Sequence, residues 1–414
     1  MKVLYISYDG MTDPLGQSQV IPYLKGLSAM GHHISILSCE KKLRFEQEGV
    51  EIKNLLLQNN IQWFPIFYTP SPPVLSTLKD VWNLKKKSRE ICVQEAIEIV
   101  HCRSYISALI GQGLKNELNL RFVFDMRGFW ADERVDGNIW NLKNPIFSMI
   151  YNYFKRKEKE FLKNADAVIS LTNNAKVEIH SWKGFQQVPI TVIPCCADLE
   201  FFSYRNVNQQ EVKQLRTALG LKQDDFVISY LGSLGTWYML NEMLDFFKVL
   251  QANKPQSKFL FITADEPELV QRAAVLKEIN ANDIIVKRAK RNEVPIYCSL
   301  SSISLFFILP KYSKKASSPT KMGELMSLGI PIICNGNVGD VAEILNDGGV
   351  GAVINNFTPS DYLKAVRLIP SLLEKPPEQN HQVAQKYYSL KEGVIKYNKV
   401  YQTIAIRGDK DGGE

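Results

Sequence analysis

The block from Lys314 to Met326 places serines, a proline and lysines where together they could bind an anion. Ser317 or Ser318 is a favourable N-cap and Pro319 a favourable first helical residue, so the pattern predicts a helix that begins here. The free N–H groups and the positive end of the dipole at a helix start form a ready anion site.

Charged side chains flank this predicted helix start. Lys314, Lys315 and Lys321 supply mobile positive charge beside it. Glu324 follows Thr320 by about one helical turn, where a carboxylate can accept hydrogen bonds from a vicinal diol. The arrangement suits a nucleoside diphosphate, with the pyrophosphate at the helix start and the ribose at Glu324. A capped surface helix with solvated lysines is the alternative interpretation.

Two predicted strand ends in the first half carry residues that could meet a ligand. Gly16, after the first strand, would let a ligand approach the backbone closely, although a simple tight turn also explains a lone glycine. His101 could donate a hydrogen bond to a ligand, or could be satisfied by its neighbours. Arg103, two residues further on, is expected on the acceptor side of the site.

A third predicted strand ends in the polar, aromatic-rich loop 125–134, at the edge where such sheets bind ligands. Arg127 or Arg134 could hold a phosphate or a sugar hydroxyl. Asp125 or Asp132 could orient such a group. A loop closed by salt bridges is the alternative.

The elements that must position these residues alternate between strand and helix through the first half. Strands are expected at Val3–Tyr8, His33–Ser38, Ile97–His101, Arg121–Met126, Asp166–Leu171 and Thr191–Pro194. Helical periodicity is found at Val20–Met30, Ser104–Glu117, Pro145–Lys163 and Asn173–Trp182. This alternation indicates a parallel sheet covered on both faces.

The second half repeats the pattern. Strands are expected at Phe226–Leu231, Phe259–Thr263, Ile284–Val286, Ile303–Ile308, Ile330–Cys334 and Ala352–Ile354, with helices at Tyr238–Leu250 and Pro319–Leu328. The fold class is therefore α/β, with two doubly wound domains that bind ligands at the carboxyl ends of their strands. The predicted segments are a first domain (1–198), a second domain (199–386), a C-terminal helix (387–407) and a disordered polar tail (408–414).

Composition and net charge narrow the classes of protein to which this sequence can belong. The 414 residues are 45% hydrophobic and 22% charged, as in ordinary globular proteins. The net charge of +7 fits a polyanionic small ligand or an acidic membrane surface, and no nucleic-acid-binding motif accompanies it. Seven scattered cysteines without a C-x-x-C pair, no signal-peptide pattern and no long apolar run predict a cytoplasmic protein.

Two basic stretches, Lys85–Arg89 and Lys155–Glu160, adjoin apolar residues at helical spacing. Both resemble amphipathic surfaces that touch anionic lipid headgroups. They are equally described as solvated faces of helices packed on their own sheet. Peripheral contact with the inner face of the plasma membrane is thus an expectation, with that alternative beside it.

Taken in order, the motifs resemble the family 4 retaining glycosyltransferases along nearly the whole chain. Ser317–Gly329 resembles their donor-site helix, in a branch that carries S-P-T-K before the glutamate, and Asp13–Gln19 resembles their glycine loop. Ile193–Phe202 is similar to their inter-domain segment, and Tyr230–Gly235 to the turn that opens their donor domain. Tyr388–Tyr401 resembles their last helix, which crosses back onto the first domain.

This resemblance implies the GT-B fold, two Rossmann-like domains that face each other across a cleft. It implies sugar transfer from a nucleotide-diphosphate donor to a saccharide or lipid-linked saccharide, with retention, no metal and no other cofactor. The donor-binding residues would be Gly16, Gly232, Ser233, Ser317, Ser318, Pro319, Thr320, Lys321 and Glu324. Catalytic roles would fall to Lys321, Lys314, Arg127 and His101, with Asp125, Arg134 and Arg103 on the acceptor side.

Three positions depart from the family pattern. Ala316 stands where the family commonly has a first glutamate, eight positions before Glu324. The stretch Gly235–Leu240 lacks the arginine and lysine that many members carry. Arg127 replaces a histidine often found in the first domain. Lys314 and Lys321 are the candidates for the charge-neutralising role.

The expected mechanism is front-face transfer, in which the diphosphate leaves on the side from which the acceptor hydroxyl arrives. Catalysis would consist mainly of holding both substrates and stabilising the charge of the leaving group. The pathway would be that of a surface polysaccharide or lipid-linked glycan. A nucleotide-sugar epimerase of similar fold and a non-catalytic nucleotide-sugar-binding subunit are the alternatives, and the residues name neither sugar nor acceptor.

Overall fold

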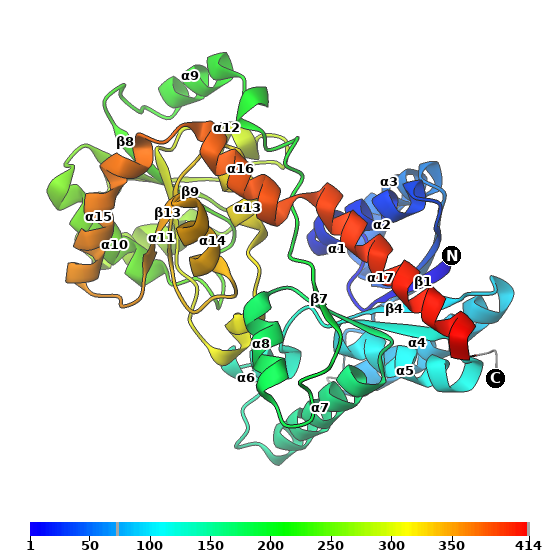
Figure 1. Cartoon of the computed structure of the whole chain (residues 1–414). Coiled ribbons are helices and arrows are strands. Elements are labelled where there is room, and N and C mark those ends of the chain that lie inside the picture. Colours follow the sequence, from blue (N-terminus) through cyan, green and yellow to red (C-terminus); the bar gives the residue numbers. More distant parts are fainter. Residues whose placement is uncertain (72–73, 412–414) are drawn as a thin grey trace. The chain divides into compact units, whose positions relative to one another are not determined.

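The computed structural model describes residues 1–71 and 74–411, which form two compact units. The N-terminal unit comprises Met1–Cys195 together with the chain from Leu390 onward, and the C-terminal unit comprises Cys196–Ser389. These limits differ by a few residues from the predicted ones. Each unit is described by itself below, with the element labels of Figure 1.

A parallel sheet forms the centre of the N-terminal unit. Across this sheet the described strands follow the order β3 (Ile61–Phe67), β2 (His33–Glu40), β1 (Lys2–Ser7), β4 (Ile99–Arg103), β5 (Arg121–Asp125), β6 (Ala167–Ser170) and β7 (Ile190–Val192). Neighbouring strands pair in parallel, with Val3 opposite both Ile34 and Ile99. The strands are short and mostly buried along their whole length, as expected for a sheet covered on both faces.

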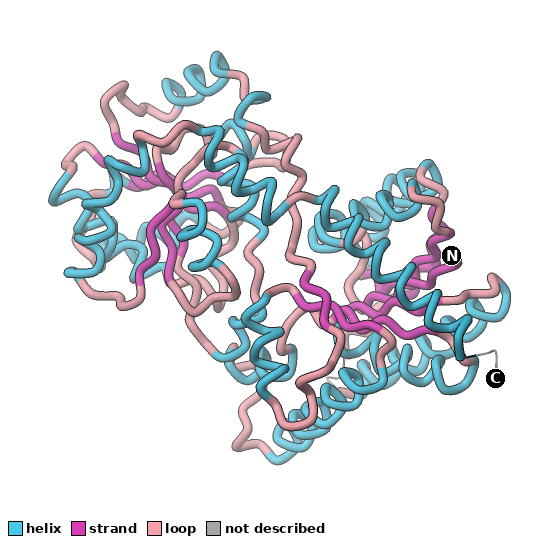
Figure 2. The backbone as a smooth tube through the Cα atoms, viewed as in Figure 1, coloured by secondary structure: helices cyan, strands magenta, loops and turns pink. Residues whose placement is uncertain are grey.

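Helices cover both faces of this sheet (Figure 2). They are α1 (Pro14–Gln19), α2 (Ile21–Ala29), α3 (Lys42–Gln58), α4 (Leu75–Gln94), α5 (Ser104–Leu118), α6 (Trp130–Asp136), α7 (Pro145–Asn164), α8 (Asn173–Ser181) and α17 (Leu390–Asp411). The helix α17 lies along α2, where a Cβ atom on Gly26 would meet Val394 at 2.6 Å. Close approach of the two helices thus requires glycine at this position.

The C-terminal unit repeats the architecture. Its described strands follow the order β10 (Ile284–Lys287), β9 (Ser257–Ile262), β8 (Phe226–Leu231), β11 (Ile303–Phe306), β12 (Ile332–Asn335) and β13 (Gly351–Ile354), all parallel. The helices are α9 (Gln209–Ala218), α10 (Leu240–Asn253), α11 (Pro267–Leu276), α12 (Val294–Cys298), α13 (Thr320–Ser327), α14 (Val341–Gly348), α15 (Pro359–Leu373) and α16 (Pro377–Tyr388). The predicted α/β class and the GT-B type of two doubly wound parallel sheets are confirmed.

The strand order reverses once in each sheet, between β1 and β4 and between β8 and β11. Open α/β sheets bind ligands at this reversal, in the crevice outside the carboxyl ends of the strands. Both candidate sites described below lie at these positions.

Several elements differ from the sequence prediction. The strand β3 and the helix α3 were not predicted, because Pro65 interrupts the apolar run of an edge strand and most side chains of α3 are exposed. Of α4, only the region around Lys85–Arg89 was given helical spacing. Pro14–Gln19, expected as part of a loop, is a helical turn. The helix α17 continues to Asp411, so residues 408–411 of the expected disordered tail are helical, and residues 412–414 lie outside the described ones.

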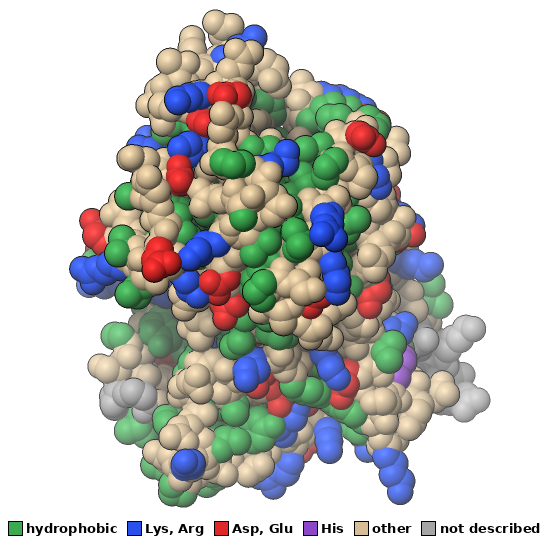
Figure 3. Space-filling view, turned by 90° about the vertical axis from the view of Figure 1, so that its left-hand side faces the viewer, with side chains coloured by type: hydrophobic (Ala, Val, Ile, Leu, Met, Phe, Trp, Pro, Cys, Tyr) green, Lys and Arg blue, Asp and Glu red, His purple; other side chains and the backbone are tan. Residues whose placement is uncertain are grey.

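On the face shown in Figure 3, Lys and Arg side chains are interspersed with Asp and Glu side chains and with hydrophobic ones. The net positive charge is therefore not gathered into a field of one sign on this face. None of the described helices combines the length and the hydropathy that a membrane crossing requires.

Candidate functional site

The helix α13 of the C-terminal unit carries the predicted donor-binding residues, but it begins differently from the prediction. It starts at Thr320 with Pro319 in the N-cap position, and Pro319 makes no side-chain cap hydrogen bond. Ser317 and Ser318 are therefore not N-caps, because they belong to an extended segment that follows the 3-10 turn Tyr312–Ala316. The N–H groups in the first turn of a helix are suited to an anion.

Lys321, in the first turn of α13, lies in a cage of aromatic rings. Its Nζ is 3.9 Å from the ring centroid of Tyr238, 4.6 Å from that of Tyr230 and 5.7 Å from that of Phe306. This nitrogen is buried and has no hydrogen-bond partner within the described part of the chain. Gly232, at φ +120°, makes the room, because a Cβ there would lie 2.7 Å from Nζ.

Burial lowers the pKa of Lys321 to about 7, and the nearby Glu324 carboxylate offsets only part of that effect. An unpaired amine that is half protonated near neutral pH is poised to gain a proton when an anion arrives. The position of Lys321 is thus consistent with its predicted role beside a diphosphate.

Glu324 is buried, with 6% of its surface exposed, and its Oε1 accepts a hydrogen bond from Arg291 Nη1 at 3.0 Å. Burial raises the pKa of Glu324, and the Arg291 guanidinium offsets part of that rise. Arg291 also lies over the rings of Phe201 and Phe202, with its Cζ 5.9 and 5.0 Å from the centroids. The carboxylate expected to accept a diol therefore already has a cationic partner.

Lys314 is not the mobile charge that the sequence suggested. It is 5% exposed, and its Nζ lies 3.5 Å from the centroid of the Trp237 ring. Its carbonyl accepts hydrogen bonds from the backbone N–H groups of Gly339 and Ser317. Trp237 thus contacts this lysine. It belongs to the stretch Gly235–Leu240, which lacks the arginine and lysine that many family members carry there. Lys315 is exposed, as expected, with its Nζ over the Tyr312 ring.

The turn after β8 is fixed by two contacts. Tyr230 Oη donates to the carbonyl of Ser233 at 2.5 Å, and the N–H of Leu234 donates to Asp265 Oδ2 at 2.5 Å. Ser233 itself is exposed. Gly232 and Ser233 therefore lie at the carboxyl end of β8, with Gly232 against the Lys321 ammonium group.

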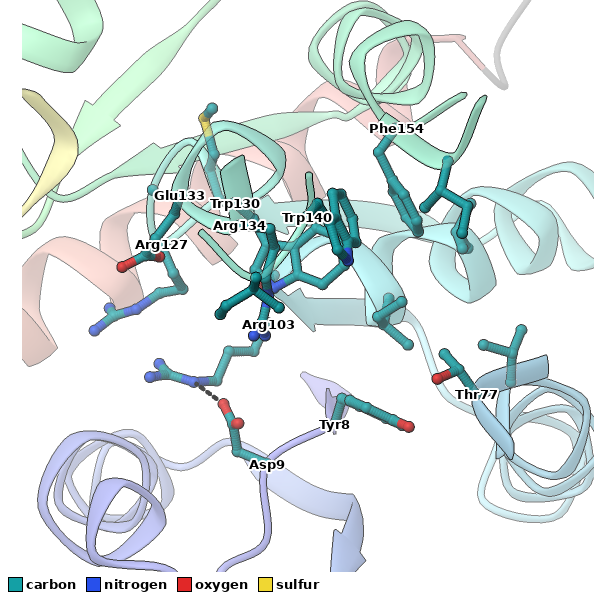
Figure 4. A pocket seen from close by; sticks show the side chains of 18 of the residues that line it. Tyr8, Asp9, Thr77, Arg103, Arg127, Trp130, Glu133, Arg134, Trp140 and Phe154 are labelled. Carbon is teal, nitrogen blue, oxygen red and sulfur yellow. Dashed lines mark ion pairs between the residues drawn. The ribbon is translucent and has the colours of Figure 1, made fainter. Parts of the chain in front are cut away.

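The N-terminal unit contains a pocket of about 990 Å³ at the reversal between β1 and β4 (Figure 4). Tyr8 and Asp9 after β1, Arg103 at the end of β4, and Arg127 and Arg134 after β5 contribute to it. Helices α4, α6 and α7 supply aromatic and aliphatic lining. The structure thus brings together three of the arginines that the sequence analysis placed on the acceptor or catalytic side.

Arg103 and Arg127 are held by few partners in this pocket. The Nε of Arg103 is 3.5 Å from Asp9 Oδ2, the ion pair drawn in Figure 4, and its Nη1 has no hydrogen-bond partner among the described residues. Arg127 Nη2 donates to Cys195 Sγ at 3.1 Å, while its Nε and Nη1 have no hydrogen-bond partner there. Arg134 lies over Trp130, with its Cζ 5.1 Å from the ring centroid.

His101 and Asp125 do not line this pocket, contrary to the prediction for both. His101 is 1% exposed, and its Nδ1 lies 2.7 Å from the hydroxyl of Tyr401 on α17. Asp125 is fully buried and accepts a hydrogen bond from Tyr397 Oη at 3.0 Å. Burial lowers the pKa of His101. Its Nδ1 is satisfied by a neighbour, as in the alternative interpretation, whereas its Nε2 lies 3.5 Å from Asp125 Oδ2 and has no hydrogen bond among the described residues. Arg127 and His101 offset the burial of Asp125 and hold its pKa below the usual range.

Gly16 allows close packing within the loop that contains it. A Cβ there would lie 2.2 Å from the carbonyl oxygen of Gly10 and 2.7 Å from Cα of Met11, so the chain itself fills the space expected for a ligand. The carboxylate of Glu40, fully buried, accepts hydrogen bonds from the backbone N–H groups of Met11 and Thr12. The glycine loop is thus a self-packed turn built around a buried carboxylate.

The basic stretch on α7 is largely paired. Lys155 Nζ lies 2.8 Å from Asp132 Oδ2 and 2.5 Å from Glu158 Oε1. Asp132, expected to orient a ligand, is therefore held by Lys155 and by the hydroxyl of Tyr151. In the described ranges 1–71 and 74–411, no three His, Cys, Asp or Glu side chains are grouped as metal ligands.

Sequence reasoning missed Arg291 and the apolar lining of the pocket. Arg291 follows β10 in the basic segment Arg288–Arg291, so the rule that polar residues after parallel strands meet ligands could have found it. Trp140 and the apolar residues of α4 and α7 carried no comparable signal, because their periodicity equally describes packing on a sheet.

Solved structures have a similar fold over nearly the whole length of this chain. Sucrose-phosphate synthase from Thermosynechococcus elongatus matches with a TM-score of 0.73 and 14% identity, over 98% of this chain and 99% of that one. Anabaena HepE in complex with UDP-glucose matches with a TM-score of 0.66 and 14% identity, over 98% and 99% of the two chains. The chain is thus a protein of the GT-B glycosyltransferase fold.

Family models match both units in turn. Glycosyltransferase Family 4 matches residues 18–201, and Glycosyl transferases group 1 matches residues 211–389. Alpha-monoglucosyldiacylglycerol synthase of Streptococcus pneumoniae is 22% identical over 338 residues, which are 80% of this chain and 72% of that protein. The chain belongs to these glycosyltransferases.

Proposed function

We propose that this glycosyltransferase moves a sugar from a nucleotide-diphosphate donor to a hydroxyl of a saccharide or lipid-linked saccharide, with retention of anomeric configuration and without a metal. The observation that carries the donor assignment is the first turn of α13, where the N–H groups of the helix start, the caged Lys321 amine and the buried Glu324 carboxylate lie within about one turn of each other. The proposed setting is cytoplasmic synthesis of a surface polysaccharide or lipid-linked glycan.

Each part of this cluster has a proposed task. The helix start and Lys321 would stabilise the charge that develops on the diphosphate as it leaves, a role that elsewhere falls to a metal ion. Glu324 would exchange its hydrogen bond with Arg291 for hydrogen bonds from the ribose hydroxyls. The acceptor hydroxyl would attack from the face on which the diphosphate leaves, so positioning supplies much of the rate.

Replacement of the carboxylate tests the donor assignment. We expect Glu324→Ala to weaken binding of the donor about a hundredfold, the loss of two charge-assisted hydrogen bonds. The matched control is Glu374→Ala, an exposed glutamate at the end of α15 in the same unit, which should bind as the wild type does. A screen of nucleotide sugars by thermal shift supplies the donor, because a tight ligand raises the melting temperature. Unchanged donor affinity in Glu324→Ala would refute the assignment.

Product analysis tests the reaction. Retention predicts that the new glycosidic bond has the anomeric configuration of the donor, read by NMR, and that turnover survives chelation of divalent metals. Interconversion of the donor into its epimer without acceptor would instead identify an epimerase. Donor binding without turnover or hydrolysis, with every candidate acceptor, would identify a non-catalytic subunit.

A further inference from the structure

The pocket of the N-terminal unit is much larger and more apolar than a sugar hydroxyl requires. Its volume of about 990 Å³ lies at the upper end of the range of about 300–1,000 Å³ for small-molecule sites. Its apolar lining includes the side chains of Val81, Trp140, Phe147, Ile150 and Phe154. These side chains offer no hydrogen bonds to sugar hydroxyls except through the indole N–H, so they favour a hydrocarbon occupant.

Two arginines line this apolar space, and some of their nitrogens lack hydrogen-bond partners among residues 1–71 and 74–411. Arg103 is 4% exposed, and the Arg127 side chain is 9% exposed. Arg103 Nε lies 3.5 Å from Asp9 Oδ2, and Arg127 Nη1 lies 3.8 Å from Asp125 Oδ2. Buried guanidinium N–H groups that lack hydrogen bonds are costly, and a phosphate is an anion whose oxygens match the guanidinium fork.

The backbone at or beside these arginines adopts left-handed conformations. Ser104, directly after β4, has φ +65°, and Arg127, two residues after β5, has φ +58°. Both are left-handed conformations that cost energy for residues other than glycine, and such strain collects at functional sites. In Figure 4 the guanidinium groups of Arg103 and Arg127 lie on one side of the pocket, opposite the rings of Trp140 and Phe154.

The rim of the pocket is apolar and exposed. Leu78 on α4 is 61% exposed, and Met149 on α7 is 65% exposed. Trp82, one turn after Leu78, is 63% exposed and carries the Lys86 ammonium group over its ring. Exposed apolar side chains beside lysines are suited to the surface of a membrane, from which an amphiphile could enter.

We propose that the N-terminal pocket binds the acceptor as a lipid phosphate, with its hydrocarbon chain in the apolar space and its phosphate between Arg103 and Arg127. The role as acceptor rests on the proposed transferase function, whereas binding of the lipid phosphate does not. The phosphate remains intact, because the group that receives the sugar is a hydroxyl elsewhere on the same amphiphile.

Binding of dodecyl phosphate, below its micellar concentration, tests this proposal in the full chain without any donor. Trp130 and Trp140 line the pocket and report occupancy through their fluorescence. We expect saturable binding that is at least tenfold tighter than that of dodecyl maltoside, a neutral amphiphile, and at least tenfold tighter than that of inorganic phosphate. Equal affinity for the neutral amphiphile, equal affinity for inorganic phosphate, or no saturable binding would overturn the proposal.

Variants locate the ligand. Arg103→Gln and Arg127→Gln should each weaken binding of dodecyl phosphate at least tenfold and bring it close to that of the maltoside. Arg89→Gln, on the exposed surface of α4, is the matched control and should bind within twofold of the wild type. If a buried arginine variant fails to fold, Met149→Glu at the exposed rim should still weaken binding by placing a carboxylate at the mouth. Wild-type affinity in Arg127→Gln and Met149→Glu would refute the assignment.

The two proposals can fail independently. Donor binding at Glu324 with no lipid phosphate in the pocket would leave the transferase function standing and remove this acceptor class. Binding of dodecyl phosphate in a chain that transfers no sugar would keep the pocket assignment and remove its role as acceptor site.

Discussion

Binding of a nucleotide sugar should be coupled to the uptake of a proton by Lys321. The pKa of this buried amine is about 7 in the free protein, and a diphosphate beside it would favour the charged form and raise that pKa. Below pH 7 the amine is already charged, so its contribution to affinity is constant. Above pH 7 each unit of pH weakens binding up to tenfold, so affinity should fall about thirtyfold between pH 6 and pH 8.5.

Isothermal titration calorimetry at several pH values measures this coupling. The dissociation constant gives the slope, and titrations in buffers of different ionisation enthalpy count the protons taken up. Lys321→Met should bind weakly and flatten the profile, because no other group in its aromatic cage titrates in this range. Lys311→Met, an exposed lysine before α13, is the control and should keep the wild-type slope.

Two results would refute this reasoning. An affinity independent of pH between 6 and 8.5 in the wild type would show that the ammonium group does not meet the donor. The same slope in Lys321→Met as in the wild type would assign the proton to another group.

Two further predictions concern stability. Tyr397→Phe removes the hydroxyl that donates to the buried Asp125, so the free energy of unfolding near neutral pH should fall by about 1–3 kcal/mol in urea titrations; a change below 0.5 kcal/mol would contradict the described contact. Gly16→Ala pushes a Cβ into the carbonyl oxygen of Gly10 and should destabilise the chain by about 1–3 kcal/mol in the same assay. Gly113→Ala, where the added Cβ would meet no described atom beyond its own stretch of helix within 4 Å, should be neutral or stabilising, and equal losses in both glycine variants would argue against the loop packing.

Most of the fold could be predicted because strand and helix periodicities alternate clearly in both halves. The sheets, their parallel arrangement and the helix at α13 follow from short apolar runs such as Phe226–Leu231. The edge strand with Pro65 and the mostly exposed helix α3 did not, because they bury too little surface to leave a clear pattern. Local sequence also could not show that Pro319 takes the N-cap position.

The sequence could indicate which polar residues lie near the candidate sites. It could not show which of them are buried against other side chains. The same rule, that residues after parallel strands meet ligands, found Arg103 and Arg127 as well as His101 and Asp125. The packing of α17 distinguishes the two pairs, because Tyr401 and Tyr397 of this helix hydrogen-bond with His101 and Asp125. That helix lies about 300 residues away along the chain, as the separation of His101 and Tyr401 shows, so no local pattern could reveal the contact.

The contact between Asp125 and Tyr397 also sets an order for biogenesis. These partners are 272 residues apart, so at ordinary rates of translation the aspartate waits roughly 15 to 50 seconds for its tyrosine. The C-terminal unit is a continuous stretch of chain and can mature on the ribosome while the earlier-made unit still lacks its last helix. The half that is synthesised first is therefore completed last, and a nascent chain would expose the groove along α2 to chaperones until α17 emerges.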